Sequence, residues 1–464
     1  MSDGIDAQSA LVADMAKHWP MITALVSGTA AMRAAGEKFM PKWPYESKES
    51  FDARLKTATL FSAFSRTCAV MSNKPFARPL AIDENKISES LKPLLSDIDM
   101  FGTDLQPFCA NLFLACMQYG LVGVLVDSPP SKGAKSRADE KEAGIRPYLS
   151  TYAASSILGW RSERNADGSH LTQLRLLESV SEPDGRFGDK AIAQIRVLEP
   201  GKWETWRKVE TSEVGKPQWI LHESGVTSIQ RIPFVFFYGL RAGFGVGHPP
   251  LIDLAFLNVE HWQSSSDQQT ILHVARIPVL FAKGFGEQDE IVIGASMATK
   301  ASKADADLRY VEHSGAAVDA GRQSLLDIED RMRQLGAELL VKRQSRNTAT
   351  EVKQESEGNK SALQKIVEDF EESIEDCLAL MGEWIGEPTD IEVGLYKDFD
   401  AGDISDLTGD LLLRATEAGL VSHETAFSEL KRIDVVHPDV QWTDEKTRIA
   451  ADPKPDESTL VQKG

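Results

Sequence analysis

Apolar residues recur every three or four positions over the first quarter of this chain, which is the period of helices that pack on a core. The stretches that fit this period best are 7–17, 20–36 and 48–71. Ser50 stands directly before Phe51 and is a suitable N-cap for the third stretch, because its hydroxyl can accept a hydrogen bond from an unpaired amide of the first turn. Residues 1–126 are therefore predicted to be mainly helical.

The run from Leu105 to Val126 contains no charged residue. Its length is compatible with a membrane span, but several polar residues and Pro107 interrupt it. Gly120 divides the run into a helical part and the sequence LVGVLV, which has the texture of a strand. We therefore expect a buried helix that leads directly into a buried strand.

Between residues 147 and 238 the pattern changes to short runs of β-branched and aromatic residues. These runs are ILGWRS (157–162), LTQLRLLE (171–178), AIAQIRVL (191–198), WETWRKV (203–209), QWILH (218–222) and PFVFFYG (233–239). Turn signals separate several of them, namely Asp167-Gly168, Asp184-Gly185 and Pro200-Gly201. The spacing predicts an antiparallel meander and disfavours a doubly wound nucleotide-binding fold.

Two long helices with a mixed segment between them follow the meander. Pro249-Pro250 begins the first helix, at about 250–276, and Pro278 ends it. In the segment 279–317, VLFAKGF and EIVIG look like strands, whereas ATKASKADAD looks like a polar helix or loop. The second helix carries apolar residues at spacings of 3 and 4: Leu325, Ile328, Met332, Leu335 and Leu339.

A third long helix is predicted to begin at the capping box formed by Thr348 and Glu351. It repeats apolar residues at a strict 4-3 spacing, which is typical of a helix packed along its whole length: Leu363, Val367, Phe370, Ile374, Cys377, Met381 and Trp384. After Gly386 we expect helices at about 403–418 and 422–432, and then an acidic tail. Helices and an antiparallel sheet in this order indicate the α+β class.

Charge is distributed unevenly along the 464 residues, whose formal net charge is −19. Residues 1–350 hold 42 acidic and 40 basic residues, whereas residues 351–464 hold 28 and 11. Such acidity argues against a protein that clamps nucleic acid, because a clamp needs a basic face to neutralise phosphates. It does not argue against a conduit, through which DNA must slide without adhering.

Motifs for catalysis or metal binding are weak. The four cysteines, Cys68, Cys109, Cys116 and Cys377, have no C-x-x-C spacing, and the histidines are scattered. The glycine run Gly243–Gly247 lacks the Lys-Ser/Thr of a phosphate loop and leads into two prolines, so a flexible joint is the simpler interpretation. We expect no enzyme activity, no cofactor and no metal.

Three segments in consistent order carry a resemblance to a known family. They are GHPPLIDLAFLNVEHWQSSSDQQTILHVARIPVLFAKGF (247–285), DRMRQLGAELLVKRQSRNTATEVKQESEGNKSALQKI (330–366) and MRAAGEKFMPKWPYESKESFDARL (32–55). In combination they resemble the portal proteins of tailed bacteriophages, and the first is similar to a domain of unknown function found in such portals.

The resemblance implies a portal fold with a helical and β wing, a two-helix stem, a small α/β clip, a long tunnel-side helix and a short helical crown. The corresponding ranges are 1–247 for the wing, 248–278 for the first stem helix, 279–317 for the clip, 318–341 for the second stem helix, 342–350 for the tunnel loop, 351–386 for the long helix and 387–464 for the crown and acidic tail.

It also implies roles for particular residues. The stem would pack through Leu325, Ile328, Met332, Leu335 and Leu339; the tunnel loop would present Lys342, Arg343, Gln344 and Arg346 to DNA; and the clip would dock partners through Glu287, Asp289 and Glu290. An ordinary helix C-terminus is the alternative for Lys342 and Arg343, because basic residues favour the negative end of the helix dipole.

The implied function is a ring, commonly of twelve subunits, at one vertex of a virion capsid. Double-stranded DNA would be packaged and ejected through it, and it would be assembled in the host cytoplasm. Its partners would be its own copies, the terminase large subunit, the capsid or scaffolding protein and a head-tail adaptor, with no membrane. The alternatives are a soluble cytoplasmic enzyme that uses the Gly243–Gly247 loop, and another head-tail connector component.

Overall fold

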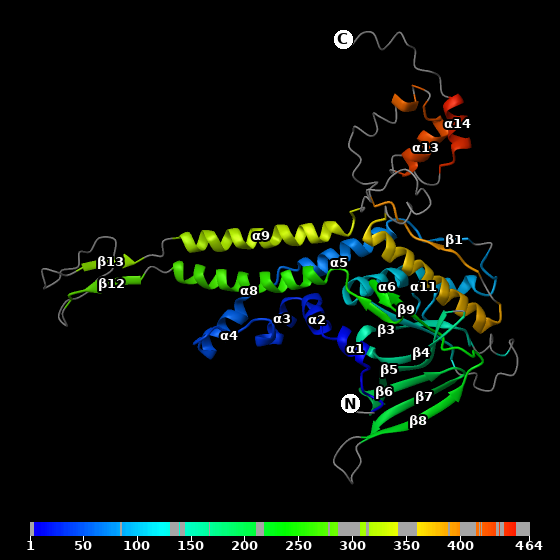
Figure 1. Ribbon diagram of the computed structural model, residues 1–464, viewed down its shortest axis with the longest axis horizontal. Coiled ribbons are helices and arrows are strands. Elements are labelled where there is room, and N and C mark those ends of the chain that lie inside the picture. The colour runs from blue at the N-terminus through cyan, green and yellow to red at the C-terminus, as the bar shows by residue number, and fades with distance from the viewer. Residues whose placement is uncertain are drawn as a thin grey trace. The chain divides into compact units, whose positions relative to one another are not determined.

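The computed structural model describes most of the chain and divides it into two compact units, Met1–Leu395 and Tyr396–Gly464 (Figure 1). The described residues are 4–83, 86–129, 139, 144–166, 168–209, 218–276, 279–285, 307–311, 315–341, 360–387, 390–399, 414–416, 418, 420–432, 436 and 440–451. The described elements combine helices with antiparallel sheets, so the α+β class is confirmed.

The larger unit contains all the described strands. Its helices are α1 (Ala10–Met15), α2 (Trp19–Ser27), α3 (Thr29–Ala35), α4 (Lys48–Thr57), α5 (Ala63–Asn73), α6 (Leu105–Tyr119), α8 (Ile252–Ala275), α9 (Ala316–Glu338) and α11 (Ala362–Ile385). Its strands are β1 (Ala81–Ile82), β2 (Leu121–Asp127), β3 (Tyr148–Ala153), β4 (Ile157–Asn165), β5 (Gly168–Asp184), β6 (Gly188–Glu199), β7 (Lys202–Val209), β8 (Gln218–Val226), β9 (Phe234–Tyr238), β10 (Leu240–Gly243), β11 (Val246–His248), β12 (Val279–Lys283), β13 (Asp307–Val311) and β14 (Val393–Gly394).

The core is built around a three-stranded sheet of order β3-β2-β9. As expected, α6 leads directly into β2, and Gly120 ends the helix in the left-handed conformation, with φ 81°. Helices α6 and α11 pack on this sheet. Phe370 of α11 lies edge-on to Phe113 of α6 and also contacts Phe237 of β9, with ring centroids 5.1 Å apart in both pairs. All three rings are buried, so α11 completes the core that the sheet begins.

The predicted meander is confirmed as a five-stranded sheet of order β4-β5-β6-β7-β8, with antiparallel neighbours throughout. The sixth predicted run is also a strand, β9, but it pairs with β2 rather than with β8. Its sequence FVFFY is apolar on both faces, and the structure accordingly buries all five residues, with Phe237 packed on Phe370 of α11 and Phe236 on Trp160 of β4.

The N-terminal helices are shorter than their patterns indicate. The stretch 20–36 is interrupted at Gly28, which has φ 84° and separates α2 from α3. The stretch 48–71 is likewise interrupted between α4 and α5. Ser50 is not the cap of α4: Ser47 is the N-cap, and its hydroxyl accepts a 3.1-Å hydrogen bond from the Ser50 amide. The helix therefore begins one turn earlier than the apolar pattern suggests.

The long helix α11 begins later than predicted. Its capping box is Ser361 with Gln364, each side chain bonding the other's backbone amide, so the chain does not form one helix over 351–386. Thr348 and Glu351 lie outside the described residues. The apolar repeat begins at Leu363, which shows that the helix starts where its buried face starts.

The smaller unit contains α13 (His423–Arg432) and α14 (Trp442–Ala451). The first confirms the helix expected at 422–432, and the rings of Phe427 and Trp442 pack with centroids 5.3 Å apart. The second was not expected, because an acidic tail was predicted there. Most of its residues are polar and none is buried, which leaves little apolar periodicity to detect.

Candidate functional site

The most prominent feature of the larger unit is an arm formed by α8 and α9 with the hairpin β12–β13 (Figure 1). The helices have 24 and 23 residues and lie side by side in opposite directions. At 1.5 Å per residue each spans about 35 Å. The hairpin lies at the end of the helices remote from the sheets, in register from Val279 opposite Val311 to Lys283 opposite Asp307.

Polar and small residues join the two helices near the hairpin. The Gln268 side-chain amide donates a 2.8-Å hydrogen bond to the backbone carbonyl of Val318, one turn inside α9. A Cβ at Gly321 would overlap that amide, so a larger residue there would displace the Gln268 side chain. A side-chain–backbone hydrogen bond therefore joins the two helices at this end of the arm.

Nearer the body, His261 of α8 faces Glu329 of α9. The His261 Nε2 atom lies 3.4 Å from Glu329 Oε1, and the imidazole is buried beside the ring of Phe61. Burial lowers the pKa of His261 below its ordinary value, because a charged imidazole loses its hydration there, although Glu329 opposes the shift. The pair therefore favours a neutral histidine within the arm.

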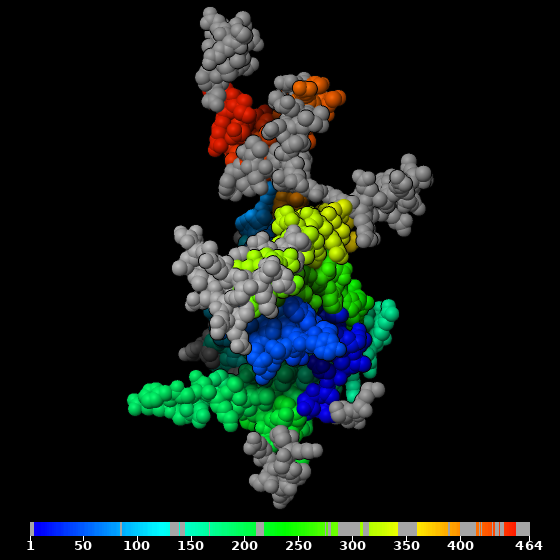
Figure 2. Space-filling model, turned by 90° about the vertical axis from the view of Figure 1, so that its left-hand side faces the viewer, coloured from blue at the N-terminus to red at the C-terminus, as the bar shows by residue number. Residues whose placement is uncertain are grey.

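Asn258 ties the base of the arm to the N-terminal helices. Its Oδ1 accepts a hydrogen bond of 2.9 Å from the Phe64 amide, and its Nδ2 donates one of 2.7 Å to the Phe61 carbonyl. The side chain is wholly buried, and both of its polar ends are satisfied, by Phe61 just before α5 and by Phe64 in the first turn of α5. Figure 2 shows the N-terminal helices (blue) lying directly against the arm (green and yellow-green).

Arg54 holds a tight turn, residues 43–46, against the arm. Its guanidinium bonds both Glu46 carboxylate oxygens at 2.9–3.0 Å and the Pro41 carbonyl at 2.9 Å. It also lies 3.6 Å from Asp267 of α8 and stacks on the ring of Trp43, 4.1 Å from the centroid. The hydrogen bonds from Arg54 hold the pKa of Glu46 below its usual range. We call residues 43–46 the aromatic turn.

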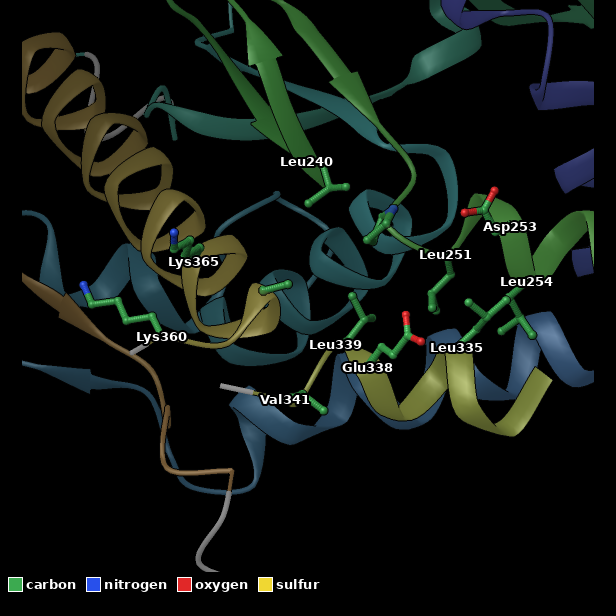
Figure 3. Close-up of a pocket in the computed structure, with 12 residues that line it drawn as sticks. Leu240, Leu251, Asp253, Leu254, Leu335, Glu338, Leu339, Val341, Lys360 and Lys365 are labelled. Atoms are coloured by element: carbon green, nitrogen blue, oxygen red, sulfur yellow. The ribbon is translucent and has the colours of Figure 1, made fainter. Parts of the chain in front are cut away.

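A hollow of about 350 Å³ lies at the base of the arm, where α8 begins, α9 ends and α11 begins (Figure 3). We call it the basal hollow. Leu251, Leu254 and Leu335 converge on it, Asp253 and Glu338 lie on the side of the arm, and Lys360 and Lys365 lie on the side of α11. It is lined by Leu240, Pro250, Leu251, Asp253, Leu254, Leu335, Glu338, Leu339, Val341, Lys360, Ala362 and Lys365.

The residues predicted to pack the stem have different environments. Ile328, Met332 and Leu339 are buried, whereas Leu325 and Leu335 are half-buried. The predicted tunnel-loop residues Lys342, Arg343, Gln344 and Arg346 lie outside the described residues, as do Glu287, Asp289 and Glu290 of the predicted clip. Strand β13, with sequence DLRYV, was not recognised in the insert, because its alternation is short and follows a polar run.

The candidates for other chemistry are held in structural roles. The glycine run 243–247 lies in the β10–β11 hairpin, where the Gly245 amide donates to the Tyr238 hydroxyl at 2.9 Å. Burial raises the pKa of the thiols, to about 12 for Cys68. Over the described part of the chain, no three His, Cys, Asp or Glu side chains form a group that could hold a metal ion. No described helix is long and apolar enough to cross a membrane.

Sequence reasoning did not identify the polar residues that organise the arm. Asn258 is the one amide in the apolar run LAFLNV, and a lone polar residue on a buried helical face is a detectable signal of a specific partner. Arg54 and Glu46 carried no such signal, because they are eight residues apart and join a loop to a helix. Tyr45 stands after Pro44, and the prolines at 41 and 44 mark a turn.

Comparison with known proteins finds one matching family, described as a domain of unknown function (DUF4055), over residues 250–385. This range includes the whole arm and α11. No curated protein matches the chain.

Among solved structures, a chain in the neck of an empty gene transfer agent (GTA) particle computed with C6 symmetry is 12% identical, with a TM-score of 0.40. The match covers 86% of this chain and 97% of that one. A chain in the neck of the native particle computed with C12 symmetry is 11% identical, with a TM-score of 0.39, over 87% and 99% of the two chains. A chain of the native GTA virion is 12% identical, with a TM-score of 0.39, over 88% and 98%.

Proposed function

We propose that this chain is the subunit of a portal ring, a structural component of a phage-like virion through which double-stranded DNA passes. The observation that supports this best is the arm: two antiparallel helices of 24 and 23 residues with a β-hairpin at the far end. It occupies the segments whose sequences resemble portal proteins. In this proposal α8 and α9 are the stem, β12–β13 belongs to the clip, and the N-terminal helices and sheets are the wing.

A slender arm of this kind suits a ring. Each helix buries one face on its partner, and the remaining faces of α9 carry exposed charges of both signs, such as Arg322, Asp330 and Arg333. Apolar side chains are exposed as well, including Phe256 on α8 and Leu326 on α9. Repetition about an axis would place such arms side by side as the wall of a tube, with each arm covered by its neighbours.

The charge of the chain suits a duct for DNA. A balanced body and an acidic C-terminal quarter limit adhesion to phosphates, which would oppose sliding. The sequence KRQSRN at 342–347 lies between α9 and α11, and twelve copies would form a basic collar. We propose that Lys342, Arg343 and Arg346 contact passing DNA there, each weakly, because salt screens charges over about 8–10 Å.

The hairpin end of the arm is the proposed docking site for other proteins. It is remote from the body, and Phe281 is exposed there, with the Arg309 guanidinium 5.5 Å from the centroid of its ring. A packaging motor and then a head-tail adaptor would bind this end in turn. Glu287, Asp289 and Glu290, in the same insert, would add an acidic surface for the partner. The acidic C-terminal unit would be the crown.

The test is the mass and shape of the purified chain. Twelve subunits of 51.1 kDa total about 0.6 MDa, which light scattering after size exclusion separates clearly from a monomer or dimer. Negative-stain images should show rings with a central hole and stems projecting from one side. A monomer that is stabilised by a nucleotide would instead support the enzyme alternative. Particles without a central channel would contradict the proposal.

A further inference from the structure

The aromatic turn presents Tyr45 to solvent in an unusual backbone conformation. The Glu46 amide donates to the Trp43 carbonyl at 3.1 Å, which closes a four-residue turn with Pro44 and Tyr45 at its centre. Tyr45 has φ 65°, a value that turns of this kind reserve for glycine or asparagine. Its side chain is fully exposed, at 106% of the reference area. A large aromatic residue in a glycine position, without contacts in its own chain to hold it there, indicates a functional constraint.

The turn beneath Tyr45 is rigid. Arg54 binds Glu46, stacks on Trp43 and reaches the Pro41 carbonyl, as described above, and Glu46 also accepts from the Trp43 amide at 3.0 Å. The side chains of Arg54 and Glu46 are almost wholly buried. Since the turn is already ordered, Tyr45 would lose little conformational freedom on binding, which is the property of an interface anchor.

The basal hollow is a suitable receptor for such an anchor. Its volume lies at the low end of the range in which proteins hold small ligands and leaves room for one aromatic side chain. Leu251 and Leu254 give it an apolar floor. Leu240 and Val341 on its rim are 42% and 58% exposed, so apolar surface there is left uncovered in the isolated chain.

The charges beside the aromatic turn complement those on the arm side of the hollow, whereas the α11 side carries Lys365 and Lys360, which pairs with Glu368. Lys42 and Lys48 flank the aromatic turn, and the carboxylate between them, Glu46, is already neutralised by Arg54. On the arm side of the hollow, Asp253 and Glu338 have no ion-pair partner within the described part of the chain. A second exposed aromatic, Phe101, lies instead in a loop whose amides bond Asp97 and Asp99, so its nearest charged neighbours in the chain do not complement the carboxylates of the hollow.

The aromatic turn cannot reach the hollow of its own chain. Arg54 holds the turn beside Asp267, whereas the hollow begins at Asp253 of the same helix. Fourteen helical residues separate these positions by about 21 Å. A second copy must therefore supply the partner surface.

We propose that Tyr45 of one subunit inserts into the basal hollow of the next and that this contact fixes the spacing of the ring. The contact joins two different surfaces, so it is heterologous, and heterologous contacts close into rings when the rotation permits. The inference rests on the proposed ring and assigns one of its interfaces. The hydroxyl of Tyr45 would face Asp253 and Glu338, and Lys42 would approach the same carboxylates.

The first test is assembly of the full chain with changes at Tyr45. Tyr45→Asn retains a residue that tolerates positive φ but removes the ring, so the fold should keep its melting temperature while the concentration for half-assembly rises by about tenfold or more. Tyr45→Phe should assemble nearly as the wild type does. Phe187→Asn is the matched control, since Phe187 is also exposed in a turn beside a basic residue, Arg186, and it should have no effect.

The second test is cross-linking of the assembled protein. The four native cysteines are buried, so Tyr45→Cys with Val341→Cys introduces the reactive pair. Oxidation should link differently tagged subunits into ladders, whereas either single variant should not. If the wild type forms rings but no cross-link appears and Tyr45→Asn assembles normally, the Tyr45 anchor is overturned. The proposed ring is then unaffected. A wild-type chain that stays monomeric at every concentration would overturn both.

Discussion

The backbone amide of Leu395 donates a 2.6-Å hydrogen bond to Oε1 of Glu371, a buried carboxylate on helix α11. One turn further along the same helix, Glu375 Oε1 accepts a 2.8-Å hydrogen bond from the Val393 amide. These two glutamates therefore hold β14, which pairs in turn with β1, a strand more than 300 residues earlier in the chain. Acidic residues that the sequence presents as surface charge are here part of the framework.

Replacing Glu371 with alanine should destabilise the larger unit by about 1–3 kcal/mol, because the Leu395 amide would lose its acceptor in a buried place. Glu371→Gln keeps an acceptor oxygen and should lose less. Chemical denaturation followed by circular dichroism measures both. Glu372→Ala, at the exposed neighbouring position, is the control and should be neutral. Equal stability of all three variants would contradict the role assigned to Glu371.

The end of the larger unit gives a sharp expectation for truncation. A chain ending after residue 399 retains β14 and both glutamate contacts, and it should still form rings. A chain ending after residue 390 loses β14, so Glu371 and Glu375 keep no strand to hold, and it should melt at a lower temperature. Thermal unfolding and light scattering of the two fragments check this. Loss of assembly in the 1–399 fragment would show that the C-terminal unit is required for the ring.

Asn258 should be intolerant of apolar replacement. Asn258→Leu leaves the Phe64 amide without an acceptor at a buried site and the Phe61 carbonyl with the Ala63 amide as its remaining donor, so it should cost about 2–4 kcal/mol. Asn258→Asp preserves the acceptor but adds a buried charge, so its cost in unfolding free energy at neutral pH measures whether the site accommodates that charge. Denaturation from pH 5 to pH 8 compares the free energies of unfolding of the two variants. A melting temperature unchanged by Asn258→Leu would contradict the anchoring of α8 by this residue.

The stability of the arm should fall as the pH falls through the histidine range. Burial lowers the pKa of His261, so below about pH 6.5 the unfolded chain binds a proton that the folded imidazole resists. Acidification therefore favours unfolding, and this contribution is absent above that range. In His261→Gln the free energy of unfolding should decrease less between pH 7.5 and pH 5.5 than in the wild type. If the free energy of unfolding changed equally with pH in the two proteins, this role of His261 would be contradicted.

Neutralising the proposed collar tests the path of DNA. The triple replacement of Lys342, Arg343 and Arg346 with glutamine should leave ring mass unchanged, because these residues follow the end of α9, and should alter the amount of genome packaged or retained. Packaged DNA is measured in particles assembled with each variant. Replacing Lys202, Lys208 and Arg186 on the five-stranded sheet in the same way provides a control of equal charge. Normal packaging by the triple variant would contradict the collar.

The elements that could be predicted are those marked in the sequence by a regular spacing of apolar residues or by turn glycines. The meander was recognised from its alternation and turn glycines, and α11 from its apolar repeat. The breaks in the N-terminal helices were missed because the 3-4 pattern continues through Gly28, while the backbone adopts a positive φ there. Ser47 rather than Ser50 caps α4, because its hydroxyl is the one that accepts from an amide of the first turn, and Ser361 caps α11 directly before its first buried residue, Leu363.

The site was less accessible to sequence reasoning than the fold. Gln268, Asn258 and Arg54 act by bonding backbone groups 13 to 197 positions away in the chain. No local periodicity encodes such partners. The apolar series of α9, by contrast, can be read from its spacing: Ile328, Met332 and Leu339 are buried, and Leu325 and Leu335 are half-buried.

The position of Phe370 has a consequence for how the chain is made. Its ring packs between Phe113 and Phe237, so the core of the larger unit lacks its central side chain until about four-fifths of the protein has been synthesised. Pairing of β1 with β14 waits still longer, because more than 300 residues separate the two strands. A nascent chain therefore leaves the ribosome with an open core, and long-range contacts of this kind are slow to form. The larger unit can therefore close only after the segments that carry Phe370 and β14 have been synthesised.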